Sequence, residues 1–123
     1  MIEDFNQLPW HDAVLADMRI DKSEPGYRDC VTLVIIWPDE TRQRIIFDDC
    51  YRLRTDMNFG VIAPDFIYSA TAVADAADVS SLVAKWRAIG AEIEGLARFE
   101  IMTSSTGSMI QVFARSFRVE DLE

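Results

Sequence analysis

Residues 30–37, CVTLVIIW, decide the fold of this 123-residue chain. The stretch is apolar at every position except Thr32 and is rich in β-branched side chains, which is typical of a strand covered on both faces. Pro38 follows it directly and marks the end of the run, because proline cannot donate a hydrogen bond to a strand ladder. We therefore predict that residues 30–37 form the central strand of a sheet.

Alternating polarity on both sides of this stretch predicts neighbouring antiparallel strands. From Val14 to Asp21, apolar residues occupy every second position, which places one face inward and the other mostly in water. Pro25 and Gly26 favour a turn before residue 30, since proline presets φ and glycine tolerates positive φ. Further strands are predicted at residues 43–47, 50–57, 96–103 and 109–119, with turns at 38–40, 58–60 and 104–108.

The segment that follows residue 77 has helical periodicity. Asp78 supplies a predicted N-cap acceptor and Gly90 a left-handed C′ position, so we predict one amphipathic helix between them. Residues 66–73 stay open between strand and helix, because alanines lie among their β-branched residues. The apolar stripe of the predicted helix consists of Val79, Leu82, Val83, Trp86 and Ile89.

Together these patterns predict an α+β fold: a mainly antiparallel meander sheet of about six to seven strands, with one amphipathic helix packed on one face. No linker, repeat or biased tract interrupts residues 1–123, so we expect a single domain. Half of the residues are hydrophobic and 11% are aromatic, a composition that excludes intrinsic disorder.

Charge and composition restrict the classes of partner. The chain carries 21 acidic and 12 basic residues, a formal net charge of -9. This sign opposes binding to a phosphate backbone and favours encounter with a basic protein, so we expect no nucleic-acid partner. We expect no membrane partner either, because the longest apolar run is short and the N-terminus lacks a secretory pattern. The two cysteines, Cys30 and Cys50, are expected to be reduced thiols in a cytoplasmic protein.

His11 is the only histidine and the first candidate for chemistry. A hydrolase or ligand-binding enzyme would use it with Asp12, Asp49 or Cys50, provided that these groups converge in space. We favour a structural interpretation, in which the Trp10 side chain packs over the end of the sheet and His11 or Asp12 forms a hydrogen bond with the backbone of a turn. No metal site or cofactor is expected, since the histidine, cysteines and neighbouring carboxylates match no ligand spacing.

Aromatic and hydroxyl side chains near predicted turns are the candidates for binding. Exposed aromatic residues that gather in one patch would mark a protein interface. The loop at residues 104–108 is rich in hydroxyls, but it contains no basic residue, which favours a hairpin turn over an anion site. The predicted binding residues are Trp10, His11, Asp12, Asn58, Phe59, Ser105 and Thr106.

The N-terminal third carries a family resemblance. The sequence Trp10-His11-Asp12-Ala13, a strand that ends at Ile20-Asp21 and the strand at residues 31–36 resemble the start of small bacterial immunity proteins of polymorphic toxin systems. This resemblance implies an acidic α+β protein that binds and neutralises a toxin and performs no catalysis. It carries no defined set of catalytic residues.

Three functional hypotheses follow. The leading one is a non-enzymatic, acidic, immunity-like protein that binds a basic protein partner, because the charge is -9 and no complete catalytic constellation is present in the sequence. The alternative is the small enzyme built on His11. The third is a structural homodimer joined through edge strands of the sheet.

Overall fold

A computed structural model describes residues 1–122 and shows an α+β fold with one antiparallel sheet of six strands. The strands lie in the order β1-β2-β3-β6-β5-β4. Two opposed meanders therefore meet at β3 and β6, where the sequence predicts one continuous meander. The elements are α1 (Ile2–Asn6), β1 (Val14–Glu24), β2 (Arg28–Ile36), β3 (Arg42–Asp56), β4 (Ile67–Val73), α2 (Ala77–Ala88), β5 (Ala97–Thr103) and β6 (Met109–Asp121).

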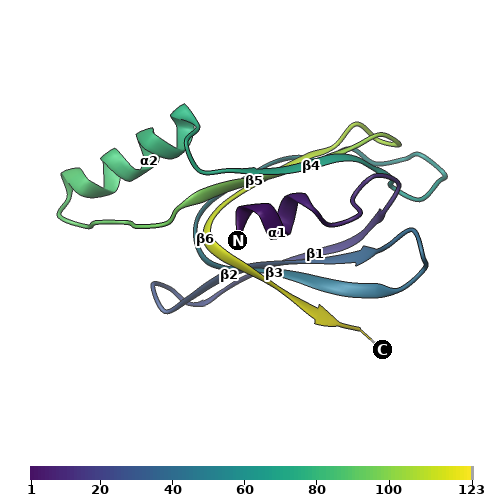
Figure 1. Cartoon of the computed structure of the whole chain (residues 1–123), viewed down its shortest axis with the longest axis horizontal. Coiled ribbons are helices and arrows are strands. Elements are labelled where there is room, and N and C mark those ends of the chain that lie inside the picture. Colours follow the sequence, from purple (N-terminus) through teal and green to yellow (C-terminus); the bar gives the residue numbers. More distant parts are fainter. Residues whose placement is uncertain (123) are drawn as a thin grey trace.

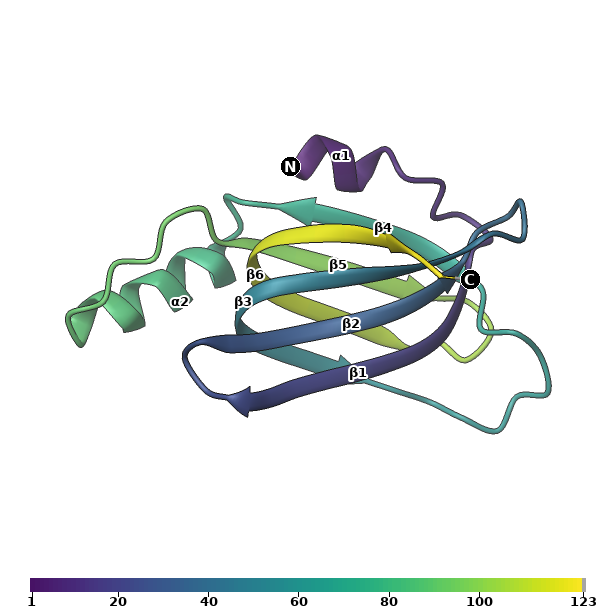
Figure 2. The ribbon, with the colours of Figure 1, turned by 90° about the horizontal axis from the view of Figure 1, so that it is seen from below.

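The sheet is folded over on itself, because β3 and β6 are long and strongly bent (Figure 1; Figure 2). β3 pairs with β6 from Gln43 to Asp56, and its ladder shifts register between Cys50 and Arg52. Asp49, at φ 53°, lies just before this shift, and a bulge bends its strand. The two strands predicted at 43–47 and 50–57 are therefore one strand with a bulge.

The segment at residues 66–73, open between helix and strand in the sequence, is strand β4. Its ladder to β5 runs from Ile67 to Val73. An isolated bridge between Val14 and Phe66 links the start of β1 to the start of β4. The first and last strands of the sheet thus touch at one end and diverge from there.

A short N-terminal helix, α1, fills the concave side of the sheet (Figure 1). Phe5 is fully buried there, and its ring lies 4.8 Å from Trp10, 5.0 Å from Phe99 and 5.3 Å from Phe117. The indole Nε1 of Trp10 donates to the carbonyl of Phe5 at 2.7 Å. The sequence patterns do not reveal α1, because five residues are too few for helical periodicity to appear.

The predicted helix is α2, and it packs on the opposite face of β6. Val79 and Leu82 of α2 bury against Phe113, whereas the neighbouring Val112 faces the concave core. Its C-terminus forms a Schellman motif around Gly90, at φ 91°, as predicted.

Asp78 does not cap this helix. The N-cap is Ala76, which makes no side-chain capping bond, and Asp78 lies in the first helical turn. Its carboxylate instead pairs with the guanidinium of Arg98 on β5 at 2.7 Å. The predicted cap is wrong because a tertiary ion pair with the sheet uses the same side chain.

Replacing Phe5 tests the concave core. We expect Phe5→Ala to lower the free energy of unfolding by about 3–5 kcal/mol, since it leaves a cavity beneath the curved sheet. Phe59→Ala, a matched change at a side chain 85% exposed, should cost less than about 0.5 kcal/mol. Urea denaturation followed by circular dichroism measures both; equal losses would contradict the central role of Phe5.

Candidate functional site

The folded sheet has two ends of different character (Figure 2). The loop end gathers the segment before β1, the β3–β4 connection at residues 57–66 and the β5–β6 connection at residues 104–108. The hairpin end contains the β1–β2 turn, the bulge of β3 and α2. Each end is held by different interactions, and the predicted site residues divide between them.

Backbone hydrogen bonds attach the N-terminal segment to the loop end. The amide of Asp12 donates to the carbonyl of Ile67 at 3.0 Å, and the amide of Ile67 donates to Ala13 at 2.7 Å. The amide of Leu15 donates to Asp65 at 3.0 Å. Residues 12–15 therefore pair with residues 65–67 as a short extra ladder that joins β1 to β4.

The hydroxyl-rich loop fixes the β3–β4 connection in place. Ser105 Oγ donates to the carbonyl of Pro64 at 2.7 Å, and Thr106 donates from both its amide and its hydroxyl to the Asp65 carboxylate. The buried Ser108 hydroxyl accepts the amide of Asn58 at 2.9 Å. These donors and acceptors serve the protein's own loops, which agrees with the predicted hairpin turn.

Six of the seven predicted binding residues gather at the loop end. Asn58 and Phe59 lie on the β3–β4 connection, His11 and Asp12 on the N-terminal segment, and Ser105 and Thr106 on the β5–β6 connection. Trp10 is the exception. Its side chain is only 4% exposed and belongs to the concave core, so it is not available to a partner.

The sequence patterns do not reveal the exposed hydrophobic surface at this end. Five of the eleven exposed large hydrophobic residues lie between residues 59 and 68, and Ile62 is fully exposed. The sequence offered one signal of this surface: a short apolar run between two predicted strands that has neither helical nor strand periodicity. We name this surface the apolar loop patch; it consists of Phe59, Val61, Ile62, Phe66 and Tyr68.

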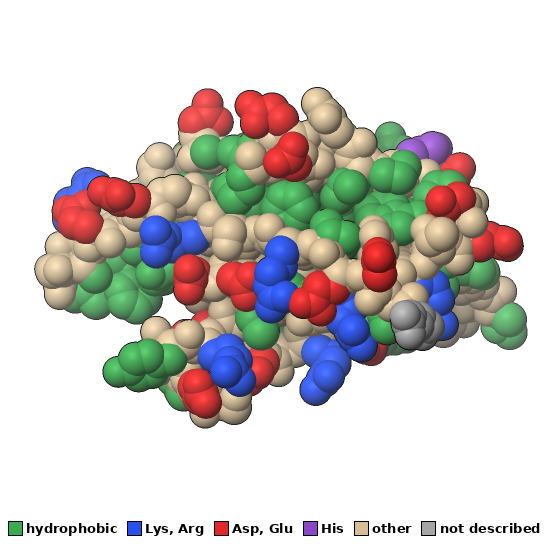
Figure 3. All heavy atoms as spheres, turned by 60° about the horizontal axis from the view of Figure 1, so that its bottom comes forward, with side chains coloured by type: hydrophobic (Ala, Val, Ile, Leu, Met, Phe, Trp, Pro, Cys, Tyr) green, Lys and Arg blue, Asp and Glu red, His purple; other side chains and the backbone are tan. Residues whose placement is uncertain are grey.

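Three exposed carboxylates lie at the same end of the sheet as the apolar loop patch. Asp12 is exposed beside His11, Asp17 lines the same hollow as Phe59, and Asp56 ends β3. Figure 3 shows this end at the right, where the single histidine lies among hydrophobic side chains and acidic groups. The loop end therefore presents an apolar centre with an acidic border.

The structure places His11 beside Asp12 but not beside Asp49 or Cys50. His11 Nδ1 lies 3.2 Å from the carbonyl of Tyr68, and its Nε2 lies 3.7 Å from the carboxylate of Asp12. Asp49 and Cys50 line a hollow at the hairpin end. The rest of β3 separates them from the loop end, a run of about 20 Å at strand geometry. Among the groups of the predicted enzyme, only His11 and Asp12 are therefore brought together.

Cys50 is also a poor nucleophile where it lies. Its thiol donates to the carbonyl of Phe47 at 3.2 Å, and burial raises the pKa of Cys50 to about 12. A thiol with such a pKa stays protonated at neutral pH, whereas nucleophilic attack requires the thiolate.

The hollow at the hairpin end has a volume of about 700 Å³ and appears in Figure 3 as a notch at the left. Tyr51 and Trp86 form one wall, with their rings edge to face at 5.2 Å, and Ile20 and Tyr27 lie on its border.

Within residues 1–122, no three His, Cys, Asp or Glu side chains are arranged to hold a metal ion. Over the same residues no helix has the length and apolar character needed to cross a membrane.

Comparison with protein-family models and with curated proteins finds no match to this chain.

Thiol labelling tests the environment of Cys50. At pH 8, we expect the thiol of Cys50 in the Cys30→Ser variant to react about a thousandfold more slowly than an ordinary cysteine of pKa 9. The Cys50→Ser variant, which retains the less buried Cys30, should react faster. In urea the two rates should become equal. Rapid labelling of Cys50 in the folded protein would overturn this assignment.

Proposed function

We propose that this protein is a non-enzymatic, immunity-like binding protein whose loop end binds a basic protein partner. The observation that carries the proposal is the concentration of exposed large hydrophobic residues in the apolar loop patch. Grouped apolar side chains with a polar border are typical of protein interaction sites.

The patch is also held in a defined position. Ser105 and Ser108 bind the two sides of the β3–β4 connection, at Pro64 and Asn58, and Thr106 holds Asp65. Binding to a surface that is already ordered costs less conformational entropy than binding to a free loop. Phe59 and Tyr68 offer the large aromatic contacts that commonly dominate binding energy.

The negative charge of the chain favours a partner with a positively charged surface. The chain has a net charge of -9, and Asp12, Asp17 and Asp56 border the patch. Acidic groups around an apolar centre steer a basic surface into contact and repel acidic ones. The resemblance of the N-terminal third to immunity proteins agrees with a cationic toxin as the partner.

Two substitutions on the patch test this proposal with the partner recovered by pull-down or with a candidate cationic toxin. We expect Phe59→Ser and Ile62→Ser each to weaken binding by about tenfold or more, because each removes apolar contact area. Ile89→Ser is the matched control, since Ile89 is 75% exposed at the C-terminal end of α2. Titration calorimetry measures the affinities, and equal effects of all three variants would refute the patch as the interface.

Salt tests the electrostatic part separately. Raising the ionic strength from about 0.05 to 0.5 M should lower the association rate by about tenfold or more, because it screens attraction between the acidic border and a basic surface. Stopped-flow mixing measures the rate. A rate that is independent of salt would show that the partner is not recognised by charge.

A further inference from the structure

The two edge strands of the sheet differ in whether another segment covers their outer backbone groups. The edge of β4 is covered by the N-terminal segment. The side chain of Asn6 bonds both backbone groups of Ala72, accepting from its amide at 2.7 Å and donating to its carbonyl at 3.2 Å. Asp12 and Ala13 bond both backbone groups of Ile67. This segment therefore blocks addition of another strand at β4.

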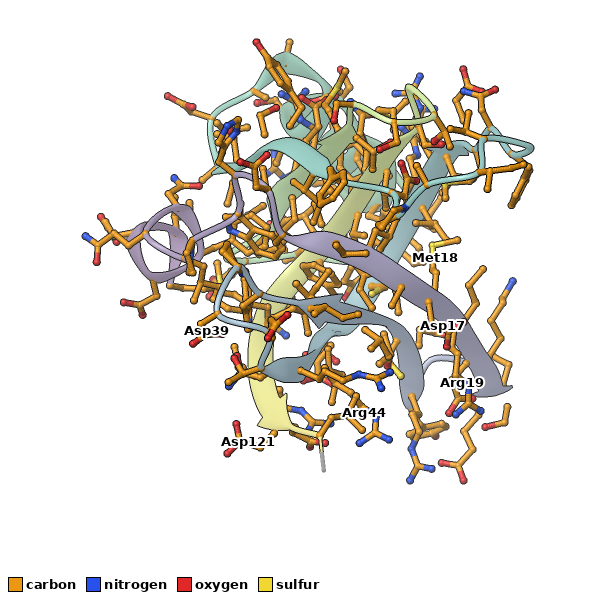
Figure 4. The ribbon with its side chains drawn as sticks, turned by 90° about the vertical axis from the view of Figure 1, so that its right-hand side faces the viewer. Asp17, Met18, Arg19, Asp39, Arg44 and Asp121 are labelled. Atoms are coloured by element: carbon orange, nitrogen blue, oxygen red, sulfur yellow. The ribbon has the colours of Figure 1, made fainter. Side chains whose placement is uncertain are left out.

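The edge of β1 is bare over most of its length. β1 pairs with β2 on one side, and on the other side only its first residues contact another segment, through the Val14–Phe66 bridge and the bond of Leu15 to Asp65. Among the described residues, no backbone partner lies beside residues 16–24 at this edge. Figure 4, which views the loop end, shows Asp17, Met18 and Arg19 along this strand.

We propose that this bare edge is the interface for a second copy of the chain. The two β1 strands pair antiparallel about a two-fold axis at Ile20 and join the two sheets into one. β1 is regular from Asp17 to Asp21, between its two register shifts, and the pairs Ile20–Ile20 and Arg19–Asp21 fall within this stretch. An unpaired strand edge is a template for another strand, and a closed two-fold contact satisfies both copies at once.

Charge complementarity selects this register. Centring the pair on Arg19 would place Arg19 opposite itself and Asp17 opposite Asp21, so that every charged pair repels. Moving the centre to Ile20 places each Arg19 opposite an Asp21 of the other copy, which gives two attractive pairs. The hydrogen bonds from Ser23 hold Asp21 Oδ1 in position at 2.6 and 2.9 Å.

Centring the pair on Met18 also gives attractive pairs, of Asp17 with Arg19, but the edge is not free there. That register places residue 21 of the second copy opposite Leu15, whose amide already bonds Asp65. The register centred on Ile20 places residues 22–24 of the second copy opposite residues 16–18 instead. A hollow of about 440 Å³ beside residues 15–18 leaves room for them.

Burial of Ile20 adds an apolar contribution. Its side chain is 55% exposed in the single chain, and it lies opposite Val31, a core residue of β2. At the two-fold axis each Ile20 faces its counterpart, which removes apolar surface from water on both copies. Phe59 and Val61 of the apolar loop patch line the hollow that receives residues 22–24 of the second copy, whereas Ile62 and Tyr68 lie outside that hollow.

Charge reversal tests the interface, with molar mass measured by light scattering across a concentration series. We expect a wild-type dimer, and Arg19→Asp and Asp21→Arg should each weaken it by about tenfold or more. A mixture of these two variants should dimerise as well as wild type, because every carboxylate then faces a guanidinium. Asp17→Arg, on the same strand but opposite Ser23 in this register, should not weaken dimerisation.

The same series can overturn the proposal. A wild-type chain that stays monomeric up to about 1 mM would exclude the dimer, and a mixture that behaves like its separate components would exclude the paired charges. Circular dichroism establishes that each variant is folded. Loss of partner binding in the Ile62→Ser variant with an intact dimer would separate the two surfaces, because Ile62 does not line the hollow beside residues 15–18.

Cross-linking tests the register. Directly opposite residues in an antiparallel pair lie within disulfide reach. In a chain that also carries Cys30→Ser and Cys50→Ser, Ile20→Cys should form an intermolecular disulfide with oxidised glutathione as the oxidant. Lys22→Cys, which would lie opposite Met18, should cross-link much less. Equal yields at the two positions would exclude a two-fold axis at Ile20.

Discussion

The packing of Phe5 inside the curved sheet is the interaction on which the rest of the structure depends. A sheet that folds over on itself has a concave face with no second sheet to cover it, and apolar side chains from both halves point into that space. Phe5 fills the centre and contacts rings from both halves, Phe47 at 6.2 Å and Phe99 at 5.0 Å. Without it, the two halves would leave a void that the surrounding strands cannot close.

The segment that follows Phe5 transmits this packing to the surface. The indole of Trp10 donates a hydrogen bond to the carbonyl of Phe5. Two residues later, Asp12 and Ala13 form backbone hydrogen bonds with the edge of β4. The same segment thus fills the core, protects one sheet edge and closes the loop end. The apolar loop patch is held in position by the interactions that begin with this anchor.

Sequence patterns predicted the parts of the fold that repeat along the chain. The alternating strands were predictable because a strand with one buried face imposes a period of two. The prediction that residues 30–37 form the central strand was wrong: β2 lies second from the β1 edge with one buried face, and β3 and β6 are central. The bulge next to Asp49 was not predictable, because one residue in an unusual conformation leaves no periodic trace. Asp78 was assigned as a cap because its partner, Arg98, is 20 positions away in the sequence. Local signals cannot reveal such distant pairs.

The candidate site was predictable to a similar degree and for the same reason. Turn signals at Asn58 and Ser105 located the loops, and both loops meet at one end because adjacent antiparallel strands return their connections to the same edge. The burial of Trp10 depended on the aromatic contact with Phe5, which no pattern in the sequence encodes. Exposure, rather than residue type, distinguishes a binding aromatic from a core aromatic.

The charges on β1 affect both the single chain and the proposed dimer. Alternating signs at Asp17, Arg19 and Asp21 discourage pairing in other registers, since an alignment centred on any of these three residues places like charges opposite each other. Two copies, each with a charge of -9, also repel at long range, and salt screens that repulsion more than it screens the short-range pairs between adjoining strands. Moderate salt therefore favours the β1 pairing while it weakens attraction of the acidic loop end to a basic partner. The two surfaces respond to ionic strength with opposite sign, because one joins like-charged bodies and the other joins unlike ones.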